Sequence, residues 1–351
     1  MKYWNKNLKN MAEYVPGEQP ENLDEYIKLN TNESPFPPSK PVLEALKDAC
    51  NENLRRYPNP TNIALRELFA AQNSLRADNV FAGNGSDEIF TLLFRGFVEP
   101  KARAAFPYPS YSLYYTLSEA NGVKFDKVNL DRNLDVDFDG LLAKEYALVI
   151  IANPNNPTGK GVDGRKVREF LGKFTGLLVI DEAYIDFYGE TLIGLVKEFD
   201  NVIVTRSLSK SYALAGLRVG LAIAHPDIIR GLLKIKDSYN VDRLAEAGAV
   251  AALKDVKGFK YSMEMVRGNK EYLEEMLEEI GFQVVPSKAN FIFTKHPGLK
   301  ARDIYEELKK RKILVRWFDG PVQSEYLRIT VGTMMEIKTL VKELKSILGG
   351  E

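Results

Sequence analysis

Residues 201–220 read NVIVTRSLSKSYALAGLRVG: an apolar run at Asn201–Thr205, a polar loop around Lys210, and a second apolar run that begins at Val219. Both runs are apolar without alternation, which is typical of strands that are buried on both faces of a sheet. Open α/β sheets bind their ligands where loops leave the carboxyl ends of strands. We therefore expect Lys210 to lie at a ligand site.

Apolar runs of the same kind occur on both sides of this stretch. Segments long enough to hold crossover helices separate them, so the pattern predicts an α/β fold with a mostly parallel sheet flanked by helices. The runs are Ala102–Phe106, Ala147–Ala152, Leu177–Ile180 and Val219–Ala224.

The pattern changes at about Arg267, and we expect three parts. Residues 1–38 are polar and rich in proline, and they predict an extended arm that packs on the small domain. Residues 39–266 form the large domain, and residues 267–351 a small α+β domain. In the small domain we expect a helix at Asn269–Ile280 and strands at Phe282–Val285, Ala289–Thr294, Ile313–Trp317 and Tyr326–Val331.

A helix after Ser39 has one apolar face, formed by Val42, Leu46, Ala49 and Cys50, so we interpret Cys50 as a core residue.

Composition excludes several classes of function. The 351 residues hold 48 Lys and Arg against 48 Asp and Glu, so there is no general attraction to nucleic acid or to an anionic membrane. One cysteine excludes a disulfide framework, and with only two histidines we expect no metal site. The N-terminus has no apolar signal region, and no run approaches 18 apolar residues. We expect a cytoplasmic protein with small-molecule ligands.

The lysine loop carries groups that suit a phosphorylated carbonyl cofactor. Lysine forms imines with carbonyl compounds, and burial lowers its pKa for that role. The hydroxyls of Ser207 and Ser209 can bind a phosphate, and Arg218 can add a bidentate contact. The alternative is a solvated loop of serine and lysine.

The strand Leu177–Ile180 is followed by Asp181, with Tyr184 three residues further on. A carboxylate at a strand end can pair with a protonated pyridine nitrogen, which keeps that ring an electron sink. Tyr184 could donate to the oxygen of such a ring. The alternative is an aspartate that only caps the next helix.

Three further segments can contact a flat, phosphorylated ring. Residues 153–159, NPNNPTG, form a turn after a strand, and asparagines such as Asn156 can bind a ligand or only shape the turn. Gly85, Ser86 and Asp87 open a helix whose free N–H groups can bind phosphate, although a simple capped helix fits as well. Tyr111 can stack on a ring, or it can pack in the core.

These segments occur in an order that resembles the fold-type I aminotransferases over nearly the whole chain. Further pieces resemble one branch of that family, the histidinol-phosphate aminotransferases. They are YVPG at 14–17, LNTNESP at 29–35, Tyr57-Pro58, GSDE at 85–88 and LRITVG at 327–332.

The resemblance implies pyridoxal 5'-phosphate (PLP) in the large domain and a role for each matching residue. Lys210 would hold the cofactor and move the proton, Asp181 would pair with the pyridinium, and Tyr111 would stack on the ring. Asn156 and Tyr184 would bind the ring oxygen. The residues around the cofactor phosphate would be Gly85, Ser86, Asp87, Ser207, Ser209 and Arg218. Tyr57 would reach the phosphate from a neighbouring subunit, which implies a homodimer.

The implied reaction is amino transfer between L-histidinol phosphate and 2-oxoglutarate in histidine biosynthesis. Arg328 matches the arginine that binds a substrate carboxylate, and Arg316 is a second candidate for the substrate anion or else a surface strand residue. Tyr14 and Asn32 of the arm could close the pocket. The alternatives are an aromatic amino-acid aminotransferase, a threonine-phosphate decarboxylase, and a PLP-binding regulatory module without turnover. Regulatory modules of this kind usually carry an added DNA-binding domain, and the short, non-basic N-terminal arm does not fit one.

Overall fold

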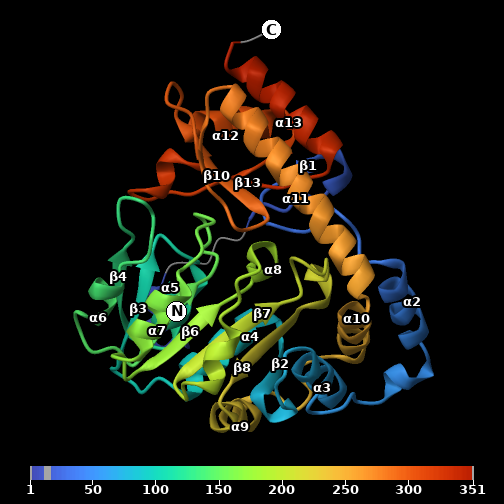
Figure 1. Ribbon diagram of the computed structural model, residues 1–351, viewed down its shortest axis with the longest axis vertical. Coiled ribbons are helices and arrows are strands. Elements are labelled where there is room, and N and C mark those ends of the chain that lie inside the picture. The colour runs from blue at the N-terminus through green and yellow to red at the C-terminus, as the bar shows by residue number, and fades with distance from the viewer. Residues whose placement is uncertain (1, 12–16, 350–351) are drawn as a thin grey trace.

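The computed structural model describes residues 2–11 and 17–349. Within them, the largest element is a seven-stranded sheet in the order β2-β8-β7-β6-β5-β3-β4 (Figure 1). The strands from β7 to β4 are parallel, whereas β8 is antiparallel to both of its neighbours. The strands are β2 (Val80–Asn84), β3 (Arg103–Tyr108), β4 (Lys124–Asn129), β5 (Leu148–Ala152), β6 (Leu177–Asp181), β7 (Val202–Ser207) and β8 (Val219–Ala224).

Helices cover both faces of this sheet, which explains why inner strands such as β5, β6 and β8 are continuously apolar. In β6, Leu178 and Ile180 join the core on one face while Val179 joins the core on the other. The helices of the first face are α2 (Lys40–Ala49), α3 (Ile63–Gln72), α7 (Gly164–Leu171) and α10 (Arg243–Lys254), and those of the second are α4 (Gly85–Gly96), α5 (Leu113–Ala120) and α9 (Pro226–Ile235). Two short helices, α6 (Phe138–Leu142) and α8 (Ile185–Tyr188), lie in loops.

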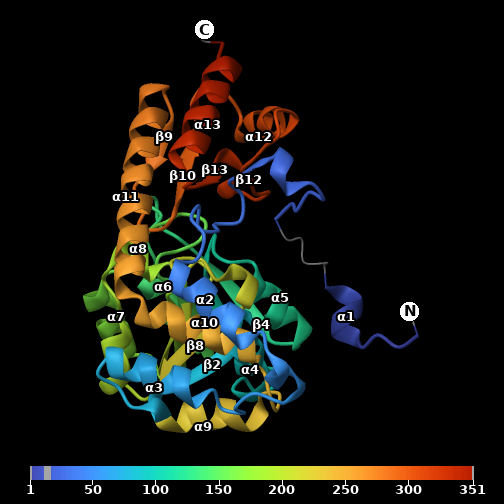
Figure 2. The ribbon, with the colours of Figure 1, turned by 90° about the vertical axis from the view of Figure 1, so that its right-hand side faces the viewer.

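A smaller antiparallel sheet, in the order β12-β13-β10-β9, is separate from the large sheet and lies above it in the view of Figure 2. Its helices share a separate apolar core with the strands. The elements are α11 (Val256–Glu279), β9 (Gln283–Val285), β10 (Phe291–Lys295), α12 (Ala301–Lys310), β12 (Arg316–Trp317), β13 (Leu327–Thr330) and α13 (Met334–Ile347).

Three predictions about local structure need correction. The helix expected at Asn269–Ile280 begins earlier, at Val256, because Asp255 caps it by accepting a hydrogen bond from the Gly258 N–H. The strand expected at Ile313–Trp317 is two strands. Its first half, β11 (Ile313–Leu314), pairs with the N-terminal arm, and its second half, β12, pairs with β13.

Cys50 is the third correction, because the core interpretation is wrong. Helix α2 ends at Ala49, and Cys50 is its exposed C-cap residue. The apolar face of α2 therefore ends before the position that its spacing predicts.

The N-terminal arm contacts both parts of the molecule. Strand β1 (Ile27–Lys28) runs parallel to β11, and the next residue, Leu29, is buried in the core of the small sheet. Helix α1 (Lys6–Asn10) instead lies against α5, where Asn7 Nδ2 donates to the Ala120 carbonyl at 3.3 Å (Figure 2).

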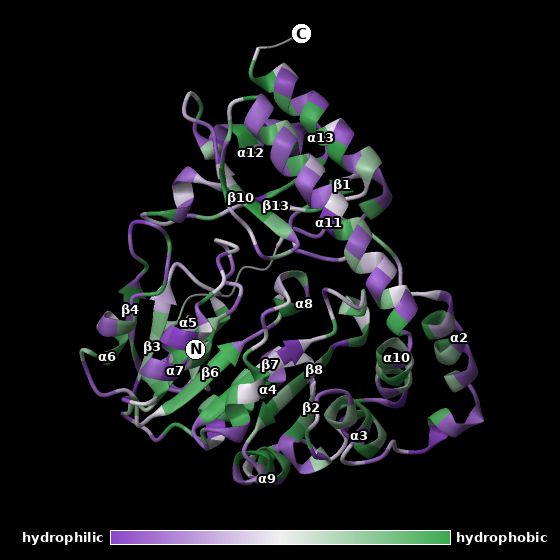
Figure 3. Ribbon diagram, viewed as in Figure 1, coloured by the Kyte–Doolittle hydropathy of each residue, from purple (hydrophilic) through white to green (hydrophobic). Residues whose placement is uncertain are grey.

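Hydropathy follows these layers. Strands β6 and β8 are largely apolar, while α11 and α13 alternate between apolar and polar residues (Figure 3). None of the helices in the described residues is long and apolar enough to cross a membrane. Among the same residues, His, Cys, Asp and Glu form no cluster that could hold a metal ion.

Candidate active site

A cavity of about 790 Å³ lies at the carboxyl ends of the parallel strands. The strand ends deliver Tyr108, Ala152, Asp181 and Ser207 to its wall, because parallel strands end at the same side of a sheet. The small sheet and the N-terminal arm close the cavity from the opposite side. They contribute Asn30, Thr31, Asn32, Arg316, Gln323 and Arg328.

Lys210 lies in the loop after β7, with its side chain in the cavity wall. Its Nζ donates to the Thr31 carbonyl at 2.9 Å, so the arm holds the amine. Burial and, next to it, the nearby charge of Arg328 lower the pKa of Lys210 to about 8, while Glu33 opposes the shift. More of this amine than of an ordinary lysine is therefore neutral near neutral pH, and the neutral form is the one that attacks a carbonyl.

Asp181 is buried at the end of β6 and accepts three hydrogen bonds. Tyr114 Oη donates to its Oδ2 at 2.6 Å, and Thr205 Oγ1 and the Ala183 N–H donate to Oδ1 at 3.1 and 3.2 Å. Burial raises the pKa of Asp181, and these hydrogen bonds lower it. The pKa is raised overall, and the hydrogen bonds limit the rise, so they favour the charged form when a cation lies in the cavity.

A group of donors surrounds the start of α4. Gly85 has φ +76° and Gly220 on β8 comes so close that a Cβ there would lie 2.4 Å from the Ser86 nitrogen. The first N–H groups of α4 have no partner within the helix. Arg218 Nη2 donates to Asp87 Oδ2 at 3.0 Å beside them.

The two serines of the lysine loop add hydroxyl groups to the same wall. Ser207 Oγ accepts from the Ser209 N–H at 3.3 Å. Ser209 Oγ is buried and has no hydrogen-bond partner among the described residues. A buried hydroxyl beside a helix N-terminus and a guanidinium fits a phosphate, because such a group accepts hydrogen bonds from all three.

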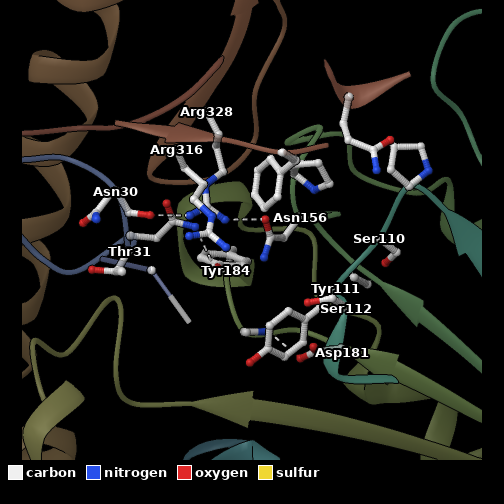
Figure 4. A pocket seen from close by; sticks show the side chains of 18 of the residues that line it. Asn30, Thr31, Ser110, Tyr111, Ser112, Asn156, Asp181, Tyr184, Arg316 and Arg328 are labelled. Atoms are coloured by element: carbon white, nitrogen blue, oxygen red, sulfur yellow. Dashed lines mark hydrogen bonds between the residues drawn. The ribbon is translucent and has the colours of Figure 1, made fainter. Parts of the chain in front are cut away.

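Arg316 and Arg328 lie directly opposite each other on β12 and β13. Both project into the cavity toward Tyr184 and Asn156 (Figure 4). Arg328 Nη1 donates to Asn156 Oδ1 and Nη2 to the Asn30 carbonyl, both at 2.6 Å. Like charges on directly opposite residues destabilise a sheet unless an anion lies between them, so this pair favours an anionic ligand.

Asn32 lies in the cavity wall, and its side chain makes two buried hydrogen bonds. Its Nδ2 donates to Tyr184 Oη at 2.9 Å, and its Oδ1 accepts from Thr330 Oγ1 at 3.0 Å. The side chain is 1% exposed. Asn32 therefore orients the Tyr184 hydroxyl, although it also lines the cavity.

Most of the residues predicted from the sequence meet at this cavity. Tyr111 lies in its wall close to Asp181 (Figure 4), and Gly85 lies next to Ser86 and against Arg218. Tyr57 does not reach it: its ring is 77% exposed and stacks on Tyr239 with centroids 4.3 Å apart. Tyr14 lies outside the described residues.

Several residues that line the cavity or bind Asp181 from behind its wall were not predicted. Tyr114 follows Tyr111 by one helical turn, and this spacing could have suggested a second tyrosine at the site. Thr205 is the register partner of Asp181 on β7, which a strand alignment could have found. Tyr108 and Gln323 carry no such signal, since they meet only through the packing of the two sheets.

Comparison with known proteins identifies the family. The model of the class I and II aminotransferases matches residues 24–344. Histidinol-phosphate aminotransferase from Clostridium beijerinckii is 42% identical over 351 residues, covering 99% of this chain and 98% of that protein. The one from Synechocystis sp. is 43% identical over 343 residues, covering 98% and 97%.

Solved structures of related proteins have the same fold as this chain. Histidinol-phosphate aminotransferase from Sinorhizobium meliloti, in complex with pyridoxal-5'-phosphate, has a TM-score of 0.92 at 25% identity and covers 99% of this chain and 98% of that one. L-threonine-O-3-phosphate decarboxylase from Porphyromonas gingivalis shares the fold, with a TM-score of 0.80 at 21% identity and 92% and 99% coverage. The predicted α/β fold and the predicted aminotransferase resemblance are confirmed. The chain belongs to the class I and II aminotransferase family, with the histidinol-phosphate aminotransferases as relatives over nearly its whole length.

Proposed function

We propose that this chain is a PLP-dependent enzyme of histidine biosynthesis that transfers an amino group between L-histidinol phosphate and 2-oxoglutarate. The products are imidazole-acetol phosphate and glutamate. The observation that carries the proposal is the arginine pair, Arg316 opposite Arg328, in the wall that faces Lys210. One substrate has a phosphate and the other has carboxylates, and guanidinium groups bind both kinds of oxyanion. The names of the relatives support the same substrate.

The residues present fit PLP. The unpartnered Ser209 hydroxyl, the start of α4 and the Arg218 guanidinium suit its phosphate. Asp181 suits its ring nitrogen, and Lys210 suits its aldehyde. When bound, PLP supplies an aldehyde that links to the amine and a pyridine ring that withdraws electrons.

The chain's own residues then bind, orient and move protons. Lys210 would hold the cofactor, and its amine would carry a proton from the substrate carbon to the cofactor carbon that takes over the amino group. Asp181 keeps a proton on the ring nitrogen, with Tyr114 and Thr205 fixing its orientation. Tyr184, oriented by Asn32, donates to the ring oxygen together with Asn156 Nδ2. Tyr111 stacks on the ring.

We also propose that the chain forms a homodimer and acts in the cytoplasm, where 2-oxoglutarate and glutamate are available. Tyr57 is exposed on the surface, and this position suits a side chain that reaches the cofactor phosphate of a second copy. The arm residue Tyr14 and the two arginines would bind the substrate.

The test is a half-reaction of the PLP-loaded protein, followed by its visible spectrum. Histidinol phosphate alone should convert the bound cofactor to its amine form. Conversion by phenylalanine or tyrosine, without conversion by histidinol phosphate, would make the chain an aromatic aminotransferase. Carbon dioxide released from threonine phosphate, without the amine form, would make it a decarboxylase. A lack of turnover with every substrate would leave a binding module.

A further inference from the structure

Tyr108 and Gln323 meet across the cavity, one from the large sheet and one from the small. Tyr108 ends β3, whereas Gln323 begins the short helix η6 (Gln323–Glu325) in the loop that joins β12 to β13. Gln323 Nε2 donates to Tyr108 Oη at 3.1 Å, and both residues line the cavity. Gln323 is 8% exposed, and a side chain at Gly320 would lie 2.2 Å from its Nε2, so the amide is tightly enclosed.

The orientation of the Gln323 amide is determined by a second contact. Nε2 also donates to the Asp319 carbonyl at 3.1 Å, and a carbonyl can only accept. The amide must therefore present N–H to the Tyr108 oxygen. Since that oxygen accepts a hydrogen bond, the hydroxyl's own proton is left to donate to another group.

A cation lies over the ring of Tyr108. Lys127 Nζ is 4.8 Å from the ring centroid of Tyr108 and 4.7 Å from that of Tyr115, and all three residues line the cavity. A positive charge at this place repels a protonated ligand group, so the wall favours a neutral hydrogen-bond acceptor. Tyr115 differs from Tyr108 because its hydroxyl donates to a backbone carbonyl, that of Pro107.

We propose that Tyr108, oriented by Gln323, is the residue that recognises the imidazole ring of the substrate. Its hydroxyl donates to the unprotonated ring nitrogen. This rests on the proposed function, since it places the imidazole of histidinol phosphate at the Tyr108 wall while the arginine pair holds the phosphate. A phenyl ring has no acceptor for this hydrogen bond, so Tyr108 separates histidinol phosphate from a phenyl analogue of the same charge.

The experiment compares two substrates with the PLP-loaded enzyme: histidinol phosphate and L-phenylalaninol phosphate, which keeps the amine and phosphate. The measured quantity is the ratio of their kcat/KM values. Tyr108→Phe should lower the ratio about tenfold or more, because a site built around a hydrogen bond loses its discrimination with the donor. Gln323→Met, which frees the Tyr108 hydroxyl to rotate, should lower the ratio in the same direction. Tyr115→Phe is the matched control and should keep the ratio.

Two results separate this inference from the proposed function. A wild-type enzyme that converts no histidinol phosphate would contradict the proposed function itself. A wild-type enzyme that converts it, with a Tyr108→Phe ratio equal to the wild-type ratio, would overturn the role of Tyr108 and leave the proposed function standing. An equal loss of ratio in Tyr115→Phe would also overturn it, because the effect would then not depend on the hydroxyl that Gln323 orients.

Discussion

Tyr114 donates a hydrogen bond of 2.6 Å to Asp181 Oδ2, from helix α5 to the end of strand β6. Burial raises the pKa of this carboxyl, and the contact with Tyr114 opposes that rise. It helps to keep Asp181 charged where the proposal needs a partner for the cofactor's ring nitrogen.

Removal of this hydroxyl should weaken catalysis more than cofactor binding. Tyr114→Phe should lower kcat by about tenfold, since a hydrogen bond to a charged group contributes about 1.5–3 kcal/mol. Asp181→Ala should lower it further and still bind PLP. Steady-state kinetics at saturating PLP measure both. The matched control is Tyr146→Phe, whose hydroxyl donates to Asp126 at 2.9 Å away from the cavity. If kcat of Tyr146→Phe fell as much as kcat of Tyr114→Phe, the loss would be a general effect of removing a buried hydroxyl.

Lys210 should carry the cofactor covalently. Borohydride reduction of the PLP-loaded protein, followed by peptide mapping, should label Lys210, and Lys210→Ala should lose nearly all activity because binding and proton transfer share that amine. A label on Lys234 or Lys236 would contradict the assignment.

The pKa of Lys210, which is lowered to about 8 mainly by burial, predicts how the rate of PLP attachment to the cofactor-free chain depends on pH. Only the neutral amine attacks, so the rate should rise with pH up to about 8 and then level off. An ordinary lysine would continue to gain rate up to about pH 10. Arg328→Ala should move the inflection to higher pH, because the charge of Arg328 lowers this pKa. Arg302→Ala, an exposed arginine on α12 that pairs with Glu306, should leave it in place.

Arg316 should contribute to binding of the phosphorylated substrate. Arg316→Ala should weaken histidinol phosphate by about 2–5 kcal/mol, the range for truncating one partner of a buried charge pair. Phenylalanine, which has no phosphate, should lose less. The comparison of KM in half-reactions measures this, with Arg302→Ala as the control. An equal loss for both substrates would assign Arg316 to the structure of the sheet instead.

The homodimer predicts complementation between two defective chains. In a mixed dimer of Lys210→Ala and Tyr57→Ala, one site has both lesions and the other has neither. An equal mixture refolded together should recover about a quarter of the wild-type sites, because half of the dimers are mixed. If the mixture has no more activity than its parents, or if the wild-type chain is a monomer by sedimentation, Tyr57 does not act across an interface.

The sequence is sufficient to predict the inner strands of the large sheet because they are buried on both faces, whereas the half-exposed edge strand β4 was not predicted. In β6, Leu178, Val179 and Ile180 are all buried, so no alternation obscures the run. Residues that directly follow strands are predictable for the same reason, and Asp181 and Lys210 both line the cavity.

Residues that depend on tertiary packing were harder to predict. The opposition of Arg316 and Arg328 depends on the register of β12 and β13, which changes if either strand shifts by one residue. Tyr57 is the clearest case, since its expected role needs a second chain. Cys50 was predicted wrongly because helical spacing does not indicate where α2 ends.

The central claim is that the amino group of histidinol phosphate moves to 2-oxoglutarate at Lys210. The direct measurement uses histidinol phosphate labelled with ¹⁵N at its amine, unlabelled 2-oxoglutarate and the PLP-loaded enzyme, with the mass of the glutamate formed as the readout. We predict that the wild-type enzyme forms ¹⁵N-glutamate and that Lys210→Ala forms none. Consumption of histidinol phosphate without formation of ¹⁵N-glutamate would contradict the claim. Formation of ¹⁵N-glutamate by Lys210→Ala at the wild-type rate would contradict it as well.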